Sequence, residues 1–270
     1  MPLIAIAIAL ISLAVLATPI DGPSGRSSFP VISSPKPAPD PLVRRRVYLG
    51  RSVRGRSIYA VEIGDPDNER RTLVVGVIHG DESAGVPIAR GLAAHPVPKE
   101  RLLWVIKDLN PDGLAAGTRQ NANGVDLNRN FPWRWRPLGV RGDLQYSGPR
   151  PLSEPESRIA RSLILRVRPQ VTVWFHQPLG VVDESGGSLG VERRFSRLSG
   201  LPLERLVRYP GSAAGWQNHR LPHSTGFVVE LPRGSPSPRR ASRYVRATLK
   251  LTPPSHDRSE VHRPAAGAGA

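Results

Sequence analysis

A histidine and two acidic residues stand at the end of the apolar run VVGVIHGDES, residues 74–83. His79 and Glu82 are three positions apart, a spacing that lets a turn just past a strand bring both side chains to one metal ion. The chain contains no cysteine, which excludes disulfides and thiolate chemistry, so any metal must be held by His and carboxylate groups. A His and a Glu at this spacing are common by chance, and the pair alone favours an ordinary strand-end histidine.

Two further apolar runs also end in a histidine or an acidic residue. The run VTVWFH ends at His176, and the run GFVVE ends at Glu230. The carboxyl ends of neighbouring parallel strands meet at one edge of a sheet, where α/β proteins form their sites. Two histidines and a carboxylate are a zinc ligand set that leaves a fourth position for water. Glu230 directly follows the apolar residues 226–229, and a charge buried there is costly unless it is paired. This favours a functional role for Glu230 over a purely structural one.

The segment 110–133, NPDGLAAGTRQNANGVDLNRNFPW, is too rich in Gly, Asn and Asp to be core structure and is interpreted as a loop that presents polar groups. Together with VIHGDES, WFHQP and VVELP, this loop resembles the zinc carboxypeptidase family, and within it the small bacterial murein peptide amidases. The resemblance covers roughly residues 48–232, and its motifs occur in the family's order. The loop residues that carry it are Arg119, Asp126, Asn128 and Arg129.

The resemblance implies a site for one zinc ion, with His79, Glu82 and His176 as ligands. It also implies that Glu230 is the general base of the reaction. Asp126 matches the carboxylate that hydrogen-bonds the first histidine ligand from behind and fixes its tautomer.

The same resemblance assigns three residues to the substrate. Arg119 matches the residue that polarises the scissile carbonyl, and Asn128 with Arg129 matches the pair that binds a substrate carboxylate. Arginine suits that contact because its planar fork binds a carboxylate through two hydrogen bonds, which lysine cannot do.

Several activities share this chemistry. The murein branch hydrolyses the bond between γ-D-glutamate and diaminopimelate in cell-wall peptides, and the alternatives are a general C-terminal carboxypeptidase and an N-acyl amino-acid deacylase. About fifty residues separate His176 from Glu230, Tyr209 is the one tyrosine between them, and no residue there is an obvious selector for apolar or basic C-termini. These features count against a simple carboxypeptidase. A non-catalytic wall-binding module is a different class of function, and it would have no need of four intact site residues.

Other polar and aromatic residues near these motifs receive structural interpretations. Asp81 is expected to cap its loop. His219 and His223 either line the pocket or are solvated loop histidines, and the second reading is favoured. Trp133 and Trp135 either shape a substrate rim or pack under the long loop.

The elements that must position these groups alternate between strands and helices. Residues 47–64 predict two strands around a turn at Arg54-Gly55, and the runs 71–79, 101–111, 170–177 and 225–232 predict buried strands. Residues 83–95 predict a helix, and a second helix is expected to begin with Ser153 as N-cap, Pro155 in the first turn and Glu156 completing a capping box. This alternation predicts a three-layer α/β/α sandwich around a mixed, largely parallel sheet.

The ends of the chain differ from its centre. Residues 1–20 are apolar from Leu3 to Ala17 and are interpreted as a signal peptide, or as an N-terminal anchor where they are not cleaved. Residues 21–42 form a Pro/Ser-rich linker, 43–252 a single zinc peptidase domain, and 253–270 a disordered tail. The protein is therefore expected outside the cytoplasm, either secreted, in the cell wall or tethered on the outer side of the membrane, with membrane contact only through an uncleaved N-terminal segment.

The charge balance is strongly basic. Lys and Arg outnumber Asp and Glu by 38 to 22, which gives a net charge of +16. The arginines are spread along the chain instead of forming one block, which argues against a nucleic-acid surface. A peptide or muropeptide is the expected substrate and an anionic cell wall a natural neighbour, although a codon-driven excess of arginine explains the charge equally well.

Overall fold

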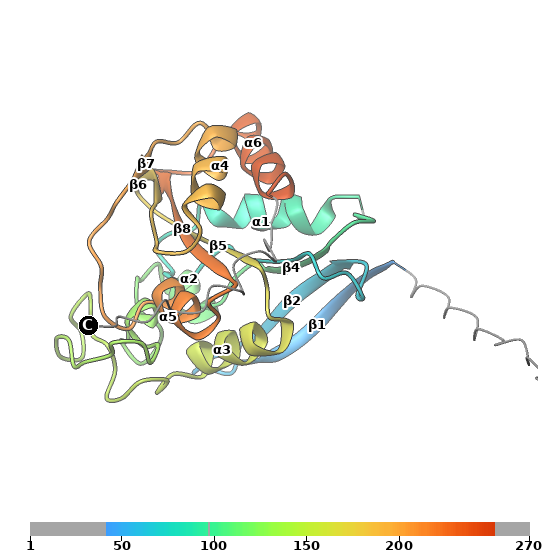
Figure 1. Ribbon diagram of the computed structural model, residues 1–270. Coiled ribbons are helices and arrows are strands. Elements are labelled where there is room, and N and C mark those ends of the chain that lie inside the picture. Colours follow the sequence, from blue (N-terminus) through green and yellow to red (C-terminus); the bar gives the residue numbers. More distant parts are fainter. Residues whose placement is uncertain (1–41, 97, 252–270) are drawn as a thin grey trace, which may run out of the picture. The chain divides into compact units, whose positions relative to one another are not determined.

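The computed structural model describes residues 42–96 and 98–251, and these residues build an eight-stranded sheet with helices on both faces (Figure 1). The spatial order of the strands is β1-β2-β4-β3-β5-β8-β6-β7. The four central strands β4, β3, β5 and β8 run parallel, as do β6 and β7, whereas the pairs β1·β2, β2·β4 and β6·β8 are antiparallel. The strands are β1 (Val43–Arg51), β2 (Ser57–Gly64), β3 (Arg71–Val75), β4 (Leu102–Ile106), β5 (Val171–His176), β6 (Leu179–Asp183), β7 (Leu203–Glu204) and β8 (Thr225–Pro232).

Two groups of helices enclose the sheet. Helices α1 (Gly85–Ala94), α4 (Leu189–Ser199) and α6 (Pro238–Leu249) cover one face, and α3 (Pro155–Val167) and α5 (Ala213–Arg220) cover the other. Side chains of one strand alternate between the two cores, as Val74 packs under α1 while Leu73 and Val75 face the α3 side. The predicted three-layer sandwich around a mixed sheet is therefore confirmed, and burial on both faces explains the continuous apolar runs of its central strands.

The strand ends differ in one respect from the prediction. Strand β3 ends at Val75 and β4 at Ile106, several residues before the ends of the apolar runs. After β3 the chain continues into the loop that carries His79. This loop passes very close to the short helix α2 (Pro111–Ala116), which follows β4. A Cβ atom at Gly80 would lie 1.9 Å from the carbonyl carbon of Gly113, so only glycine fits there. The backbone next to His79 is therefore packed closely against α2.

The predicted capping box of α3 is wrong. The N-cap is Glu154, and the Ser153 hydroxyl donates to the Glu154 carboxylate at 2.7 Å instead of receiving a backbone N–H. The Glu156 carboxylate accepts hydrogen bonds from the Val53 backbone N–H and the Asn121 amide, both at 3.0 Å. The Ser153 hydroxyl and the Glu156 carboxylate therefore bind other partners than the backbone N–H groups that a capping box requires. Pro155 is nevertheless the first residue of the helix, as predicted.

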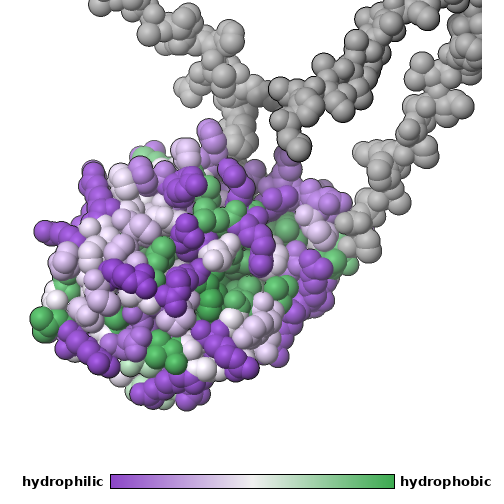
Figure 2. Space-filling model, turned by 90° about the horizontal axis from the view of Figure 1, so that it is seen from below, coloured by the Kyte–Doolittle hydropathy of each residue, from purple (hydrophilic) through white to green (hydrophobic). Residues whose placement is uncertain are grey.

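The predicted terminal segments fall outside the described residues. This applies to the export segment 1–20, to the tail 253–270, and to all of the 21–42 linker except Leu42. In the part of the chain that the structure describes, no helix has the length and apolar character needed to cross a membrane. Hydrophilic side chains are spread over the face seen in Figure 2, with apolar residues in small groups between them.

Candidate active site

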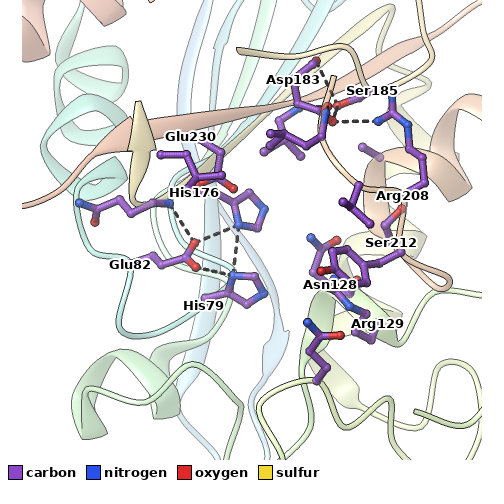
Figure 3. A pocket seen from close by; sticks show the side chains of 18 of the residues that line it. His79, Glu82, Asn128, Arg129, His176, Asp183, Ser185, Arg208, Ser212 and Glu230 are labelled. Atoms are coloured by element: carbon purple, nitrogen blue, oxygen red, sulfur yellow. Dashed lines mark hydrogen bonds and ion pairs between the residues drawn. The ribbon is translucent and has the colours of Figure 1, made fainter. Parts of the chain in front are cut away.

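Three potential ligand atoms converge beyond the carboxyl ends of β3 and β5 (Figure 3). His79 Nδ1 lies 2.9 Å from Glu82 Oε1 and 3.1 Å from His176 Nδ1, and the latter lies 2.9 Å from Glu82 Oε2. One ligand atom from each residue falls within 4.8 Å of the others, and all three residues are buried. Two imidazoles and a carboxylate at these separations suit a tetrahedral zinc ion with one position left open.

The tautomer of His79 also fits a metal ligand. Asp126 Oδ1 lies 2.9 Å from His79 Nε2, and because a carboxylate only accepts, Nε2 must carry a proton. Nδ1, which faces Glu82 and His176, is therefore the nitrogen on which a metal ion would take the place of a proton. Asp126 is itself fixed, since it is fully buried and accepts from the Asn128 backbone N–H at 2.8 Å. That bond caps the 3₁₀ turn η1 (Leu127–Arg129), which explains why Asp126, Asn128 and Arg129 occur close together in the sequence.

The electrostatics of this cluster favour a bound cation. Burial lowers the pKa of His79, but the carboxylates of Asp126 and Glu82 outweigh it and raise the pKa to about 9. Burial raises the pKa of Glu82, yet His79 and His176 together bring that pKa well below its usual value. The ionised carboxylates of Asp126 and Glu82 thus both contact the His79 ring and stabilise positive charge there. A divalent metal ion bound to these residues can supply that charge.

Arg119 lies beside the ligand carboxylates. Its Nη1 donates to Glu82 Oε1 at 3.0 Å, and its Nε and Nη2 donate to Asp126 Oδ2 at 3.1 and 2.9 Å. Burial lowers its pKa, but Asp126 and Glu82 more than compensate, so the guanidinium stays charged. Its side chain is 20% exposed and lines the cavity next to the metal-binding residues.

Glu230 stands beside His176 in the sheet. The register of β5 and β8 pairs these two residues directly. Glu230 Oε2 is buried and has no hydrogen-bond partner among the described residues. Burial raises the pKa of this carboxyl, and the lowering by His176 does not offset it. A carboxylate of raised basicity that keeps one oxygen free next to a metal site is suited to proton transfer.

Asn128 and Arg129 line the same cavity from η1. Asn128 Oδ1 accepts from the Ala213 backbone N–H at 2.9 Å, which leaves its NH₂ group free to donate into the cavity. The Arg129 guanidinium lies 4.1 Å from the centre of the Tyr209 ring, and its Nε has no partner within the described ranges. Burial lowers the pKa of Arg129. A buried guanidinium with unused donors is suited to an anionic group.

These groups surround one cavity of about 470 Å³. Its rim carries apolar side chains that are well exposed, among them Leu144 at 69%, Leu179 at 58% and Val207 at 73%. Part of its wall is formed by the small residues Ala214 and Gly215. The cavity can therefore take a ligand with both charged and apolar parts.

Several polar cavity residues were not predicted from the sequence, among them Gln177, Asp183, Ser185 and Arg208. The Gln177 side chain accepts from the Ala84 N–H and donates to the Pro232 carbonyl, so it ties the ligand loop to β8. Asp183 is buried at the end of β6 and accepts from Ser185 Oγ at 2.6 Å and from Arg208 Nη1 at 2.9 Å. Its place directly after the apolar strand residues Val181 and Val182 was the signal that could have identified it.

The other histidines, the tryptophans and Asp81 near the motifs lie outside the cavity lining. His219 belongs to α5 and stacks on Trp133 with ring centroids 3.3 Å apart, and neither His219 nor His223 is among the residues that line the cavity. Trp135 is half-buried, donates from its indole N–H to the Ser147 carbonyl at 3.3 Å, and is not among the residues that line the cavity. The predicted capping role of Asp81 is wrong, because its exposed carboxylate accepts no hydrogen bond within the described part of the chain.

Comparison with known proteins identifies relatives of this arrangement. A profile of the zinc carboxypeptidase family matches residues 39–178. Murein peptide amidase A of Escherichia coli K12 is 34% identical over 183 residues, which cover 63% of this chain and 74% of the relative. Murein peptide amidase A of Vibrio campbellii is 36% identical over 213 residues, covering 71% and 84%.

A solved structure agrees with these sequence matches. The crystal structure of a murein-tripeptide amidase from Escherichia coli O157 superimposes with a TM-score of 0.60 at 29% identity, over 75% of this chain and 89% of that one. The profile match ends at Pro178, so it includes the predicted metal ligands and the residues of the 110–133 loop but not Glu230. The location of Glu230 rests on the pairing of β5 with β8.

Proposed function

The chain belongs to the zinc carboxypeptidase family and is a metallopeptidase, and on this premise we propose that it hydrolyses the amide bond between γ-D-glutamate and diaminopimelate in murein peptides. The observation that carries the proposal is the arrangement of five residues around one cavity: His79, Glu82, His176, the base Glu230 with its free Oε2, and the buried Arg129. The names of the relatives support the choice of murein as the substrate.

We assign His79, Glu82 and His176 as the residues that hold zinc. Zinc bound there would supply Lewis-acid polarisation of a carbonyl and lower the pKa of water from ~16 towards ~7. The chain's own groups must then orient the substrate, move the protons and stabilise the charge that develops on the carbonyl oxygen.

Arg129 and Asn128 orient the substrate. Asn128 has an unused amide group and Arg129 a charged guanidinium, both residues line the cavity, and together they bind a free carboxylate next to the scissile bond. The planar guanidinium is held on the Tyr209 ring, so little side-chain freedom is lost when the carboxylate binds. This contact requires the leaving-group residue to have a free carboxylate.

Glu230 moves the proton. Its Oε2 has no partner to give up, and burial raises its pKa towards the operating pH, which improves a general base. It takes the proton of the attacking water and returns it to the leaving amine. Arg119, charged and next to Glu82, stabilises the negative charge that develops on the carbonyl oxygen.

A general C-terminal carboxypeptidase and an N-acyl amino-acid deacylase would use the same groups. The test is to incubate the purified, zinc-loaded protein with muropeptides and with plain C-terminal dipeptides and to identify the products by mass. Release of diaminopimelate from the muropeptides supports the proposal. Cleavage of the plain peptides alone would favour the carboxypeptidase, and cleavage of neither would favour the non-catalytic wall-binding module.

We also propose that the chain acts outside the cytoplasm, and the apolar run from Leu3 to Ala17 supports export of the chain. The strongly positive net charge suits an enzyme that works next to an anionic wall. Fractionation of the native host with an antibody tests this location. The full-length chain found wholly in the cytoplasm would contradict it.

A further inference from the structure

An ion pair forms part of the cavity wall and has no task in the reaction described above. Asp183 Oδ2 lies 2.9 Å from Arg208 Nη1, and both residues line the cavity. Figure 3 shows Asp183, Ser185 and Arg208 grouped apart from the metal-binding residues and apart from Asn128 and Arg129. The cavity therefore has a third polar region besides the metal site and the carboxylate clamp.

The sheet register fixes the distance of this region from the base. Strand β6 is antiparallel to β8, with Val181 opposite Glu230 and Val182 opposite Val229. Because side chains alternate along a strand, Asp183 points to the same face of the sheet as Val181 and Glu230. Two residues along a strand span about 7 Å. A side chain of lysine length that starts near the scissile bond can therefore reach Asp183, while a short side chain cannot.

Both partners keep unused hydrogen-bonding capacity. Asp183 Oδ1 accepts one bond, from the Leu206 backbone N–H at 3.0 Å, and so has a lone pair left. The Arg208 side chain is 42% exposed and uses only its Nη1 among the described residues. An acceptor and several donors thus lie side by side. The complementary ligand is a group that carries an ammonium and a carboxylate on one carbon.

The wall between the base and the ion pair is apolar. Val228, two residues before Glu230 on β8, lies on the same face of that strand, and Ala214 and Leu206 also line the cavity. These apolar side chains suit methylene groups. The combination describes a long side chain with an apolar stem and a zwitterionic end.

We infer that Asp183 and Arg208 form a specificity subsite for a diamino dicarboxylic acid as the leaving-group residue, with Asp183 binding the distal ammonium and Arg208 the distal carboxylate. This inference rests on the proposed function and names the residues that select its substrate. Lysine has only the distal ammonium and would bind Asp183 but not Arg208. 2-Aminopimelate has only the distal carboxylate and would bind Arg208 but not Asp183. Each partial ligand leaves one charged group of the protein without its partner.

The test uses three synthetic substrates with the same γ-D-glutamyl acyl group and diaminopimelate, lysine or 2-aminopimelate as the leaving group. Wild-type protein should cleave the diaminopimelate substrate with kcat/KM at least about tenfold above each of the other two. Asp183→Asn should remove the preference over 2-aminopimelate, and Arg208→Gln should remove the preference over lysine. The matched controls are Glu184→Gln and Arg205→Gln, which make the same charge changes at neighbouring residues outside the cavity lining.

Three outcomes overturn the subsite. Equal kcat/KM of the wild type on all three substrates refutes it while the proposed function stands, and this arm does not depend on how the variants fold. Equal loss on all three substrates in both variants, with lowered melting temperatures, shows that the pair only supports the fold. Cleavage of plain C-terminal dipeptides without cleavage of any γ-D-glutamyl substrate refutes the proposed function, and the subsite with it.

Discussion

His176 and Glu230 are directly opposite each other in the parallel pairing of β5 with β8. Adjacent strands lie about 4.8 Å apart, so backbone hydrogen bonds set the distance between this potential metal ligand and the potential base. A slip of one residue in this register would turn Glu230 to the other face of the sheet. The distance between His176 and Glu230 thus depends on a buried pair of central strands, whereas His79 and Glu82 lie in the loop after β3.

Replacement of His176 by alanine should remove metal and activity together. The loss of one of three ligands should weaken metal binding by more than the ~10–100-fold typical of changes behind the ligands. Elemental analysis of the dialysed variant measures the effect. His219→Ala is the matched control, because that histidine stacks on Trp133 outside the cavity lining. Full metal occupancy in His176→Ala would refute the ligand assignment.

Replacement of Arg129 by lysine should raise KM with little change in kcat. The variant keeps the charge but loses the fork that binds a carboxylate through two hydrogen bonds, and such a contact contributes on the order of 2–4 kcal/mol. Amidation of the substrate carboxylate should impair the wild type to a similar degree. The clamp would be misassigned were both the variant and the amidated substrate to give ordinary KM values.

Glu192 predicts a pH dependence of stability. This carboxyl is buried in α4 and accepts from the Ser185 backbone N–H at 2.9 Å, and burial raises its pKa from 4.5 to about 7. Between these two values the folded state holds a proton that the unfolded state has released. The contribution of Glu192 to stability is therefore complete below pH 4.5 and is lost as the pH rises through about 7.

Glu192→Gln removes this titration and keeps an oxygen that can accept from Ser185. The melting temperature of the variant relative to the wild type should therefore increase from pH 5 to about pH 7 and level off towards pH 8, both proteins being saturated with zinc. Thermal unfolding followed by circular dichroism at several pH values measures the difference. A difference that is constant over this range would contradict the raised pKa.

The part of the site that could be predicted from the sequence lies at the ends of continuous apolar runs. His176 and Glu230 end such runs, and parallel central strands bring their ends to one edge for general reasons of topology. The residues of the 110–133 loop were found through the family resemblance, since no periodic pattern places a long loop. All seven residues predicted for metal, base and substrate line one cavity, and Asp126 contacts His79 from behind.

The features that were missed depend on contacts between distant parts of the chain. Asp183 gains its place from the antiparallel pairing of β6 with β8, and Arg208 lies in an irregular segment after β7. The expected capping box of α3 failed because Asn121, more than thirty residues earlier, binds both Glu154 and Glu156. Local patterns cannot reveal such partners, because tertiary packing overrides local preference.

The central claim is that Glu230 is the general base, and the variant Glu230→Gln tests this claim most directly. Glutamine keeps the shape of the side chain and removes its basicity, so the fold, the zinc content and KM should be preserved. The kcat should fall by about three orders of magnitude or more, because a general base typically contributes ~10²–10⁴ in rate and this one transfers the proton twice. Melting temperature, metal content and kcat are measured on the same preparation, with Glu204→Gln as a control for an exposed carboxylate. Turnover close to that of the wild type would contradict the proposed mechanism, as would a large drop in melting temperature with kcat per folded molecule unchanged.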